Sequence, residues 1–83
     1  MDNMKAWVVY ILRCNDSTLY TGITNNLKKR ITSHSYGKGS KYTRSRLPVE
    51  LVYQEQAKNR SEATRRELEI KRLSHGDKMK IME

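Results

Sequence analysis

Two short hydrophobic runs near the start of the chain are separated by a polar segment. Residues 7–12 (Trp-Val-Val-Tyr-Ile-Leu) are β-branched, aromatic or aliphatic throughout, and residues 19–23 (Leu-Tyr-Thr-Gly-Ile) alternate around a Gly. Between them, residues 14–18 (Cys-Asn-Asp-Ser-Thr) have the polar composition of a turn. The pattern therefore predicts a β-hairpin.

This hairpin brings two tyrosines onto one face of the predicted sheet. If the turn centres on Asn15, Tyr10 lies opposite Tyr20, and both phenols project from the same side because side chains alternate along a strand. Gly22 shares that side in this register. Because Gly22 has no side chain, we expect it to let another backbone, such as that of a nucleic acid, approach closely.

Helical periodicity begins directly after the hairpin. Residues 24–26 (Thr-Asn-Asn) are typical of a helix N-cap, and the apolar stripe that follows consists of Leu27 and Ile31, with Arg30 at its edge and His34 one turn beyond. The hairpin face and this helix edge can form one pocket that suits a phosphodiester. Taken singly, each residue also has a structural interpretation, since strand tyrosines usually pack and surface arginines are usually solvated.

The second half of the chain has the pattern of one strand and two helices. Residues 49–55 are strand-like, and Ser61 is the expected cap of a helix that runs from residue 62 to about residue 73. The buried stripe of this helix is expected to consist of Ala63, Ile70 and Leu73. Ser74 then opens a short last helix that packs Met79 and Met82.

Glu67 lies on the flank of this helix that faces the core, about 40° around the axis from Ala63. A half-buried carboxylate needs a partner, and Lys71, four residues later, can form an ordinary helix ion pair with it. A metal ion is the other candidate partner. The spacing alone does not decide between the two.

The net charge of +8 is concentrated in one segment. Residues 17–49 contain no Asp or Glu, whereas their basic residues are Lys28, Lys29, Arg30, Lys38, Lys41, Arg44 and Arg46. Within this segment, residues 36–46 mix cations, small residues and two aromatics, which is typical of a loop that follows a phosphate backbone and stacks on exposed bases. The alternatives are a merely soluble basic loop and an anionic membrane surface, and the segment lacks the amphipathic helix that a membrane surface would need.

We therefore expect a nucleic acid as the partner, either DNA or RNA. The residues expected to contact the nucleic acid are Gly22, Lys28, His34, Lys38, Lys41, Tyr42, Arg44, Arg46 and Lys71.

Length and cysteine content favour a minimal single domain that spans residues 1–83. The lone Cys14 excludes an internal disulfide. No apolar run approaches the roughly 18 residues of a membrane span, and no export signal is evident, so we expect a cytoplasmic location.

The residues Val8-Val9-Tyr10, Tyr20-Thr21-Gly22 and Arg30, followed by a Glu in a later helix, make the chain resemble the GIY-YIG nuclease superfamily. It is most similar to the small stand-alone bacterial branch of single-domain, UPF0213-like proteins, and the resemblance runs from about residue 6 to residue 80. Val8 and Val9 replace the Gly and Ile of the first motif. The resemblance implies an α/β (α+β) fold, with a three-stranded, mainly antiparallel sheet flanked by helices in the order β-β-α-β-α-α.

The resemblance also implies a divalent-metal-dependent endonuclease that hydrolyses DNA phosphodiester bonds, in DNA repair or recombination. The expected catalytic residues are Tyr10, Tyr20, Arg30 and Glu67, and Glu67 aligns with the family's metal-binding Glu, which would hold Mg²⁺ or Mn²⁺. Tyr10 would act with a water molecule as general base, Arg30 would neutralise charge on the phosphate, and Tyr20 would orient the phosphate or the water. Because an ordinary phenol is a poor base at neutral pH, we expect Arg30 and Lys71 to lower the pKa of Tyr10.

Two other classes of function remain open at this point. One is a nucleic-acid-binding module with the nuclease fold and little or no turnover. Every feature of the sequence fits this class equally well, except the combination of Tyr10, Arg30 and Glu67. An adaptor for another repair or recombination protein is the more distant alternative.

Overall fold

The computed structural model describes residues 6–83 and has three strands and four helices in the expected order, with one short helix added. The elements are β1 (Trp7–Arg13), β2 (Leu19–Thr24), α1 (Leu27–Ser35), α2 (Lys41–Arg44), β3 (Glu50–Ala57), α3 (Arg60–Lys71) and α4 (His75–Ile81). The added helix, α2, lies in the basic segment that was expected to be a loop. The predicted α+β fold is therefore confirmed.

The three strands form one antiparallel sheet in the order β2-β1-β3, so β1 is the central strand. In the hairpin, Tyr10 pairs with Gly22, and Leu12 pairs with Tyr20. The expected direct pairing of Tyr10 with Tyr20 is wrong by two residues. Because the shift is an even number, both phenols still project from the same face.

The turn explains this shift of register. Its centre is Asp16 rather than Asn15, because the Asp16 carboxylate accepts a hydrogen bond from the Thr18 backbone N–H at 3.1 Å. Ser17 adopts a left-handed conformation with φ 69°, and its N–H donates to the Cys14 carbonyl at 2.9 Å. The turn therefore occupies residues 14–18, as the composition suggested, and only its centre differs.

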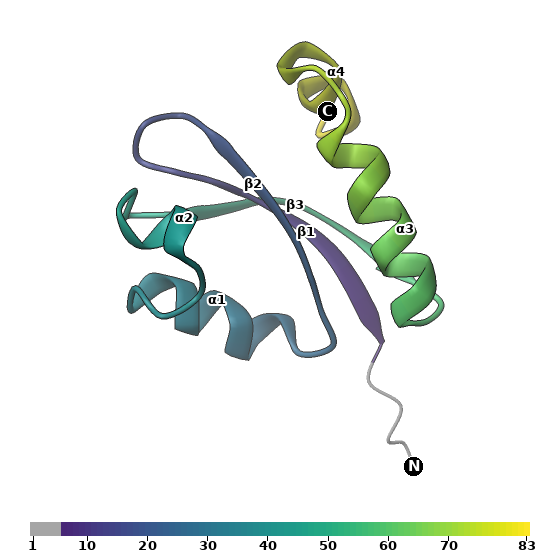
Figure 1. Cartoon of the computed structure of the whole chain (residues 1–83), viewed down its shortest axis with the longest axis horizontal. Coiled ribbons are helices and arrows are strands. Elements are labelled where there is room, and N and C mark those ends of the chain that lie inside the picture. Colours follow the sequence, from purple (N-terminus) through teal and green to yellow (C-terminus); the bar gives the residue numbers. More distant parts are fainter. Residues whose placement is uncertain (1–5) are drawn as a thin grey trace.

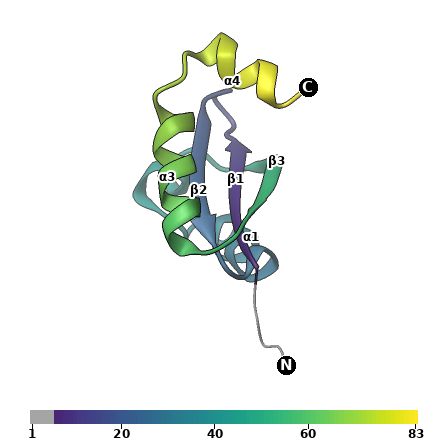
Figure 2. The same ribbon diagram turned by 90° about the vertical axis from the view of Figure 1, so that its right-hand side faces the viewer.

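Helices cover both faces of the sheet, which is why β1 is apolar at almost every position (Figure 1). On one face, Val9 and Ile11 form the core with Ala63 and Ile70 of α3. On the other face, Tyr10 lies against His34 of α1, and Tyr20 stacks on Tyr42 of α2. Figure 2 shows α3 alongside β2, the edge strand that carries Tyr20.

The last two helices have local caps that fix where they begin. Asn59 caps α3, since its side chain accepts from the Glu62 N–H at 2.8 Å, and the expected cap at Ser61 is wrong. Ser74 caps α4 as expected, by accepting from the Asp77 N–H at 3.1 Å. None of the helices within residues 6–83 has the length and apolar composition to cross a membrane.

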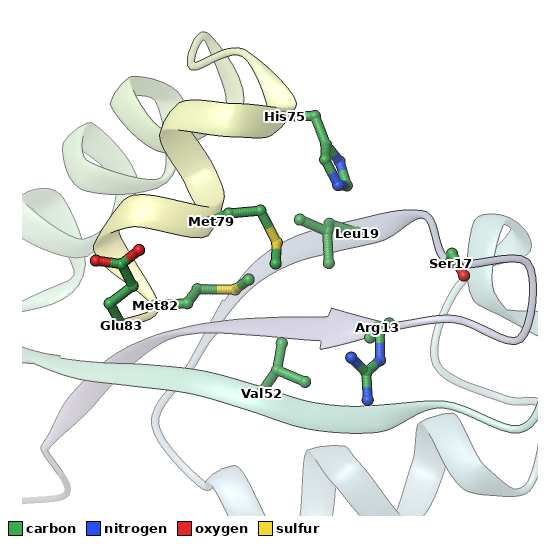
Figure 3. Close-up of a pocket in the computed structure, with 8 residues that line it drawn as sticks. All are labelled: Arg13, Ser17, Leu19, Val52, His75, Met79, Met82 and Glu83. Carbon is green, nitrogen blue, oxygen red and sulfur yellow. The ribbon is translucent and has the colours of Figure 1, made fainter.

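The last helix packs over the turn end of the sheet and leaves a cavity beneath it. Met82 packs against the core, whereas Met79 is half-exposed. Figure 3 shows both methionines above Leu19 and Val52. These four residues help to line a cavity of about 400 Å³. This cavity is lined by other residues than those of the pocket predicted around the two tyrosines.

Candidate active site

A hydrogen-bonded cluster forms between the central strand and α1. The Tyr10 hydroxyl lies 3.0 Å from His34 Nε2, and Arg30 Nε donates to the same hydroxyl at 3.4 Å. Arg30 Nη2 also donates to the Gly39 carbonyl at 3.0 Å. Arg30 and His34 are one helical turn apart, so α1 presents both side chains to the strand. The predicted convergence of Tyr10 and Arg30 is therefore present.

Tyr20 extends this cluster toward the surface. Its ring centroid lies 6.5 Å from that of Tyr10 and 5.3 Å from that of His34, with an edge-on arrangement toward the imidazole. Tyr10 and His34 have no exposed surface, whereas Tyr20 is partly exposed. Tyr20 is thus the phenol that solvent reaches.

Burial sets the protonation states of the inner groups. Burial raises the pKa of the Tyr10 phenol, the hydrogen bond from Arg30 lowers it only in part, and the charge of Glu67 raises it slightly further. The expectation that nearby cations lower this pKa is wrong, because desolvation is the larger effect. Burial, followed by the charge of Arg30, lowers the pKa of His34, so that the imidazole is neutral at physiological pH.

Two glycines allow the cluster to pack this closely. A Cβ on Gly22 would lie 2.5 Å from Tyr10 Oη and 2.7 Å from Tyr10 Cζ, so the phenol ring occupies the space above Gly22. A Cβ on Gly39 would collide with the His34 ring. The structure therefore gives Gly22 a packing role that the sequence interpretation did not foresee, while a contact with nucleic acid stays a prediction.

The basic segment is more ordered than expected because Arg46 ties it to the hairpin turn. Arg46 Nε pairs with Asp16 at 3.0 Å, Arg46 Nη1 donates to the Tyr42 carbonyl at 2.9 Å, and the Arg46 carbonyl accepts from Asn15. The guanidinium carbon lies 3.9 Å from the Tyr42 ring centroid, and Tyr42 stacks on Tyr20 at 5.9 Å. Arg46 thus supports the site from within the protein, and its charge is already paired with Asp16.

The other predicted nucleic-acid contacts divide into exposed and buried groups. Exposed side chains belong to Lys28, Lys38, Lys41, Tyr42, Arg44 and Lys71. His34 is fully buried, so in this structure it has no surface with which to contact nucleic acid. Its contacts assign it to the Tyr10 cluster instead.

Glu67 is the carboxylate of α3 whose charge reaches the cluster. Only 18% of its side chain is exposed, and its Oε2 pairs with Lys71 Nζ at 3.3 Å, so the predicted ion pair is present. Within residues 6–83, there is no group of three or more His, Cys, Asp or Glu residues that could hold a metal ion by themselves. A single carboxylate still suits Mg²⁺, which proteins often hold through one or two carboxylates, with substrate phosphate and water as the other ligands.

Sequence interpretation missed Gly39 and Thr43, which contact the imidazole, and Ser40, which holds Thr43. Thr43 Oγ1 lies 2.9 Å from His34 Nδ1, and the Ser40 side chain caps α2 by accepting from the Thr43 N–H at 3.2 Å. The available signal was Ser40, three residues before Thr43, which is the spacing of a helix N-cap. This signal is weak because the neighbouring residues are glycines and lysines.

Comparison with known proteins shows which sequences this chain is similar to. The family model described as the GIY-YIG catalytic domain matches residues 6–80. A UPF0213 protein from Staphylococcus haemolyticus is 55% identical over 80 residues, which cover 96% of this chain and 98% of that protein. A UPF0213 protein from Desulfotalea psychrophila is 61% identical over 70 residues, which cover 83% of this chain and 64% of that protein.

Two solved structures have the same fold. The solution NMR structure of a UPF0213 protein from Bacillus halodurans has a TM-score of 0.59 at 43% identity, and the match covers 92% of this chain and 81% of that chain. The solution NMR structure of a protein from E. faecalis has a TM-score of 0.66 at 37% identity, over 99% and 88% of the two chains.

Proposed function

The chain belongs to the GIY-YIG nuclease family, and we propose that it is an endonuclease that hydrolyses DNA phosphodiester bonds with the help of a divalent metal ion. The observation that carries the proposal is the packing of Tyr10, Arg30 and His34 into one hydrogen-bonded cluster, with Tyr20 at its outer edge. Each of these groups has a use in phosphodiester hydrolysis.

Arg30 is the group best placed to bind the phosphate. A guanidinium has five N–H donors, and here one is directed to Tyr10 and one to the Gly39 carbonyl. The remaining donors are available to the non-bridging oxygens, and the side chain is partly exposed. Because its orientation is fixed by these two bonds before substrate binds, Arg30 would stabilise the charge that develops in the transition state.

Tyr10 and His34 together supply a route for a proton. A neutral imidazole beside the phenol can take the Tyr10 proton while the phenol oxygen takes one from the attacking water. Because His34 takes the Tyr10 proton, that proton does not have to be released to solvent. The transfer therefore compensates for the raised pKa of Tyr10. Tyr10 has no exposed surface, so the substrate must open a path to its oxygen when it binds.

Glu67 is the residue that would hold the metal ion, either Mg²⁺ or Mn²⁺. Its carboxylate is mostly shielded from solvent and carries the oxygen donors that these ions prefer. When bound, the ion would polarise the phosphate and stabilise the leaving oxygen. Lys71, which pairs with Glu67 at 3.3 Å, would then be released toward the nucleic acid.

A binding module that has lost turnover is the second candidate, and one observation favours it. Tyr10 is inaccessible and its pKa is raised, which are unfavourable properties for a base that must meet water. The exposed cations of α1 and α2 would serve such a module equally well.

The test is a cleavage assay on branched, nicked, single-stranded and duplex DNA and on RNA, with Mg²⁺, with Mn²⁺ and with chelator. We expect cleavage of at least one DNA substrate that stops when the metal is removed. Binding without cleavage under every condition would favour the binding module.

A further inference from the structure

A line of buried polar side chains runs from β1 through α1 to α2. The Tyr10 hydroxyl lies 3.0 Å from His34 Nε2, and on the opposite side of the ring His34 Nδ1 lies 2.9 Å from Thr43 Oγ1. All three residues are fully buried. Since solvent cannot supply missing partners, the hydrogens of these groups can be placed by counting donors and acceptors.

The count begins at Tyr10. Its hydroxyl has two neighbours, Arg30 Nε, which can only donate, and His34 Nε2. The phenol proton needs an acceptor, because an unmade hydrogen bond inside the protein costs the full desolvation of the group. His34 Nε2 can accept it only if the imidazole carries its proton on Nδ1.

The same arrangement satisfies the other end of the line. Nδ1–H of His34 donates to Thr43 Oγ1, and the Thr43 hydroxyl donates either to the Ser40 carbonyl at 3.5 Å or to the Ser40 hydroxyl at 3.0 Å. In the opposite tautomer, His34 Nε2–H and Arg30 Nε–H would both point at the Tyr10 oxygen. The phenol proton would then lack an acceptor among residues 6–83.

We propose that Thr43 is a positioning residue that accepts the Nδ1 proton of His34 and so stabilises the tautomer that Tyr10 and Arg30 require, in which Nε2 stays free to take the proton of Tyr10. This role rests on the proposed function, in which Tyr10 passes a proton to His34. A His34 with its proton on Nε2 would have no lone pair to offer at that atom. Thr43 itself touches neither the substrate nor the reacting atoms.

The surrounding segment keeps Thr43 in place. Ser40 caps α2 and contacts Thr43 through its hydroxyl, and α2 is held against the hairpin turn by Arg46 and Asp16. Gly39 lets the chain pass directly over the imidazole, because any side chain there would collide with the ring. Residues 39–46 thus form a cradle for one histidine in addition to contributing exposed cations.

The test uses Thr43→Val, which keeps the shape of the side chain and removes the oxygen, and Thr43→Ser, which keeps the hydroxyl. The tautomer of His34 is determined in the free protein from the ¹⁵N shifts of histidine in long-range ¹H–¹⁵N spectra. His75, which is exposed on α4, is the control histidine in the same spectra. Melting temperature serves as the folding control.

We expect wild-type protein and Thr43→Ser to have the His34 proton on Nδ1, and Thr43→Val to shift it toward Nε2, with the His75 signals unchanged. Cleavage by Thr43→Val should fall on the order of 10²-fold, with recovery in Thr43→Ser. A wild-type His34 protonated on Nε2, or a tautomer unchanged in Thr43→Val, would overturn the role of Thr43. Because the tautomer is measured without substrate, a wild-type protein that cleaves nothing would instead overturn the proposed function.

Discussion

The Tyr10 hydroxyl lies inside the protein, between a cation that donates to it and a neutral imidazole whose Nε2 lies 3.0 Å away. This environment gives the phenol a fixed position and a ready acceptor for its proton, at the cost of direct access for water. Tyr20, which is partly exposed, has the opposite properties. The two tyrosines therefore have separable roles.

Replacing each tyrosine by phenylalanine distinguishes these roles. Tyr10→Phe removes the group that exchanges a proton with His34, and we expect cleavage to fall about 10²-fold or more, whereas Tyr20→Phe removes an orienting hydroxyl and should cost less. Single-turnover cleavage of one DNA substrate from about pH 6 to 9 measures both effects, because the lowered pKa of His34 and the raised pKa of Tyr10 keep both groups neutral over most of this range. A fully active Tyr10→Phe protein would exclude Tyr10 from the chemistry.

Gly22 provides a test of the packing around Tyr10. In Gly22→Ala the new Cβ would lie 2.5 Å from Tyr10 Oη, so the ring must move and the cluster must loosen. We expect a loss of about 1–3 kcal/mol in the free energy of unfolding, the usual cost of overpacking, together with lower cleavage.

Gly76→Ala is the matched control for this change, because its Cβ would have no neighbour closer than 4.0 Å and it lies within helix α4. Alanine is the better helix former, so this variant should be as stable as wild type or slightly more stable in urea unfolding. Equal stability of the two variants would show that the Tyr10 ring is free to move aside.

At the scale of elements, the basic segment contains two kinds of cation. Lys38, Lys41 and Arg44 are exposed, whereas Arg46 pairs with Asp16, covers the Tyr42 ring and holds α2 against the hairpin turn. A contact with phosphate and a contact within the protein respond differently to the same substitution. The segment can therefore be dissected by mutation.

Changing Lys38, Lys41 and Arg44 together to Ala should make DNA binding less sensitive to salt. If these three contact phosphates, the slope of log K against log salt should become shallower by about 2–3, while the melting temperature stays near that of wild type. Arg46→Ala should change the slope by less than the loss of one phosphate contact would, and it should lower the melting temperature. A triple variant with an unchanged slope would place the DNA-binding surface elsewhere.

The elements themselves were largely predictable from sequence, whereas their fine placement was not. Period-two and helical patterns predicted the hairpin, the third strand and three of the helices. The hairpin register was missed because the Asp16 side chain recentres the turn, and the start of α3 was missed because Asn59 caps it two residues before the expected Ser61. Both errors arise from single side-chain hydrogen bonds, which periodicity does not report.

For the site, sequence predicted which residues come together but not how deeply they are buried. The convergence of Tyr10 with Arg30 followed from alternation along the strand and the position of Arg30 on its helix. The enclosure of His34 did not follow, because it depends on Gly39 and Thr43, which lie in a segment with the composition of a flexible loop. The raised pKa of Tyr10 did not follow either, because it arises mainly from burial. In the structure, tertiary contacts pack this segment against the cluster.

At the scale of the whole molecule, the sheet separates two functions. Figure 1 shows α3 on one side of the sheet and α1 with α2 on the other. The face toward α3 forms the core of Val9, Ile11, Ala63 and Ile70, and the other face holds the buried polar cluster. Glu67 belongs to α3, yet its charge is felt at Tyr10. The helix that completes the core thus also supplies the carboxylate for the metal ion in the proposed mechanism.

The most direct test of the nuclease proposal compares binding with cleavage in Arg30→Ala and Glu67→Gln. Glu62→Gln is the matched control for the second variant, since Glu62 lies on the same helix and pairs only at the surface, with Arg65. DNA affinity and single-turnover cleavage are measured with Mg²⁺ and Mn²⁺ on the substrate that the wild-type protein cuts best. We predict that both active-site variants bind DNA nearly normally and cleave it about 10²-fold more slowly or worse, while Glu62→Gln cleaves like wild type. Wild-type rates of cleavage in Glu67→Gln and Arg30→Ala, or no metal-dependent cleavage by the wild-type protein, would contradict it.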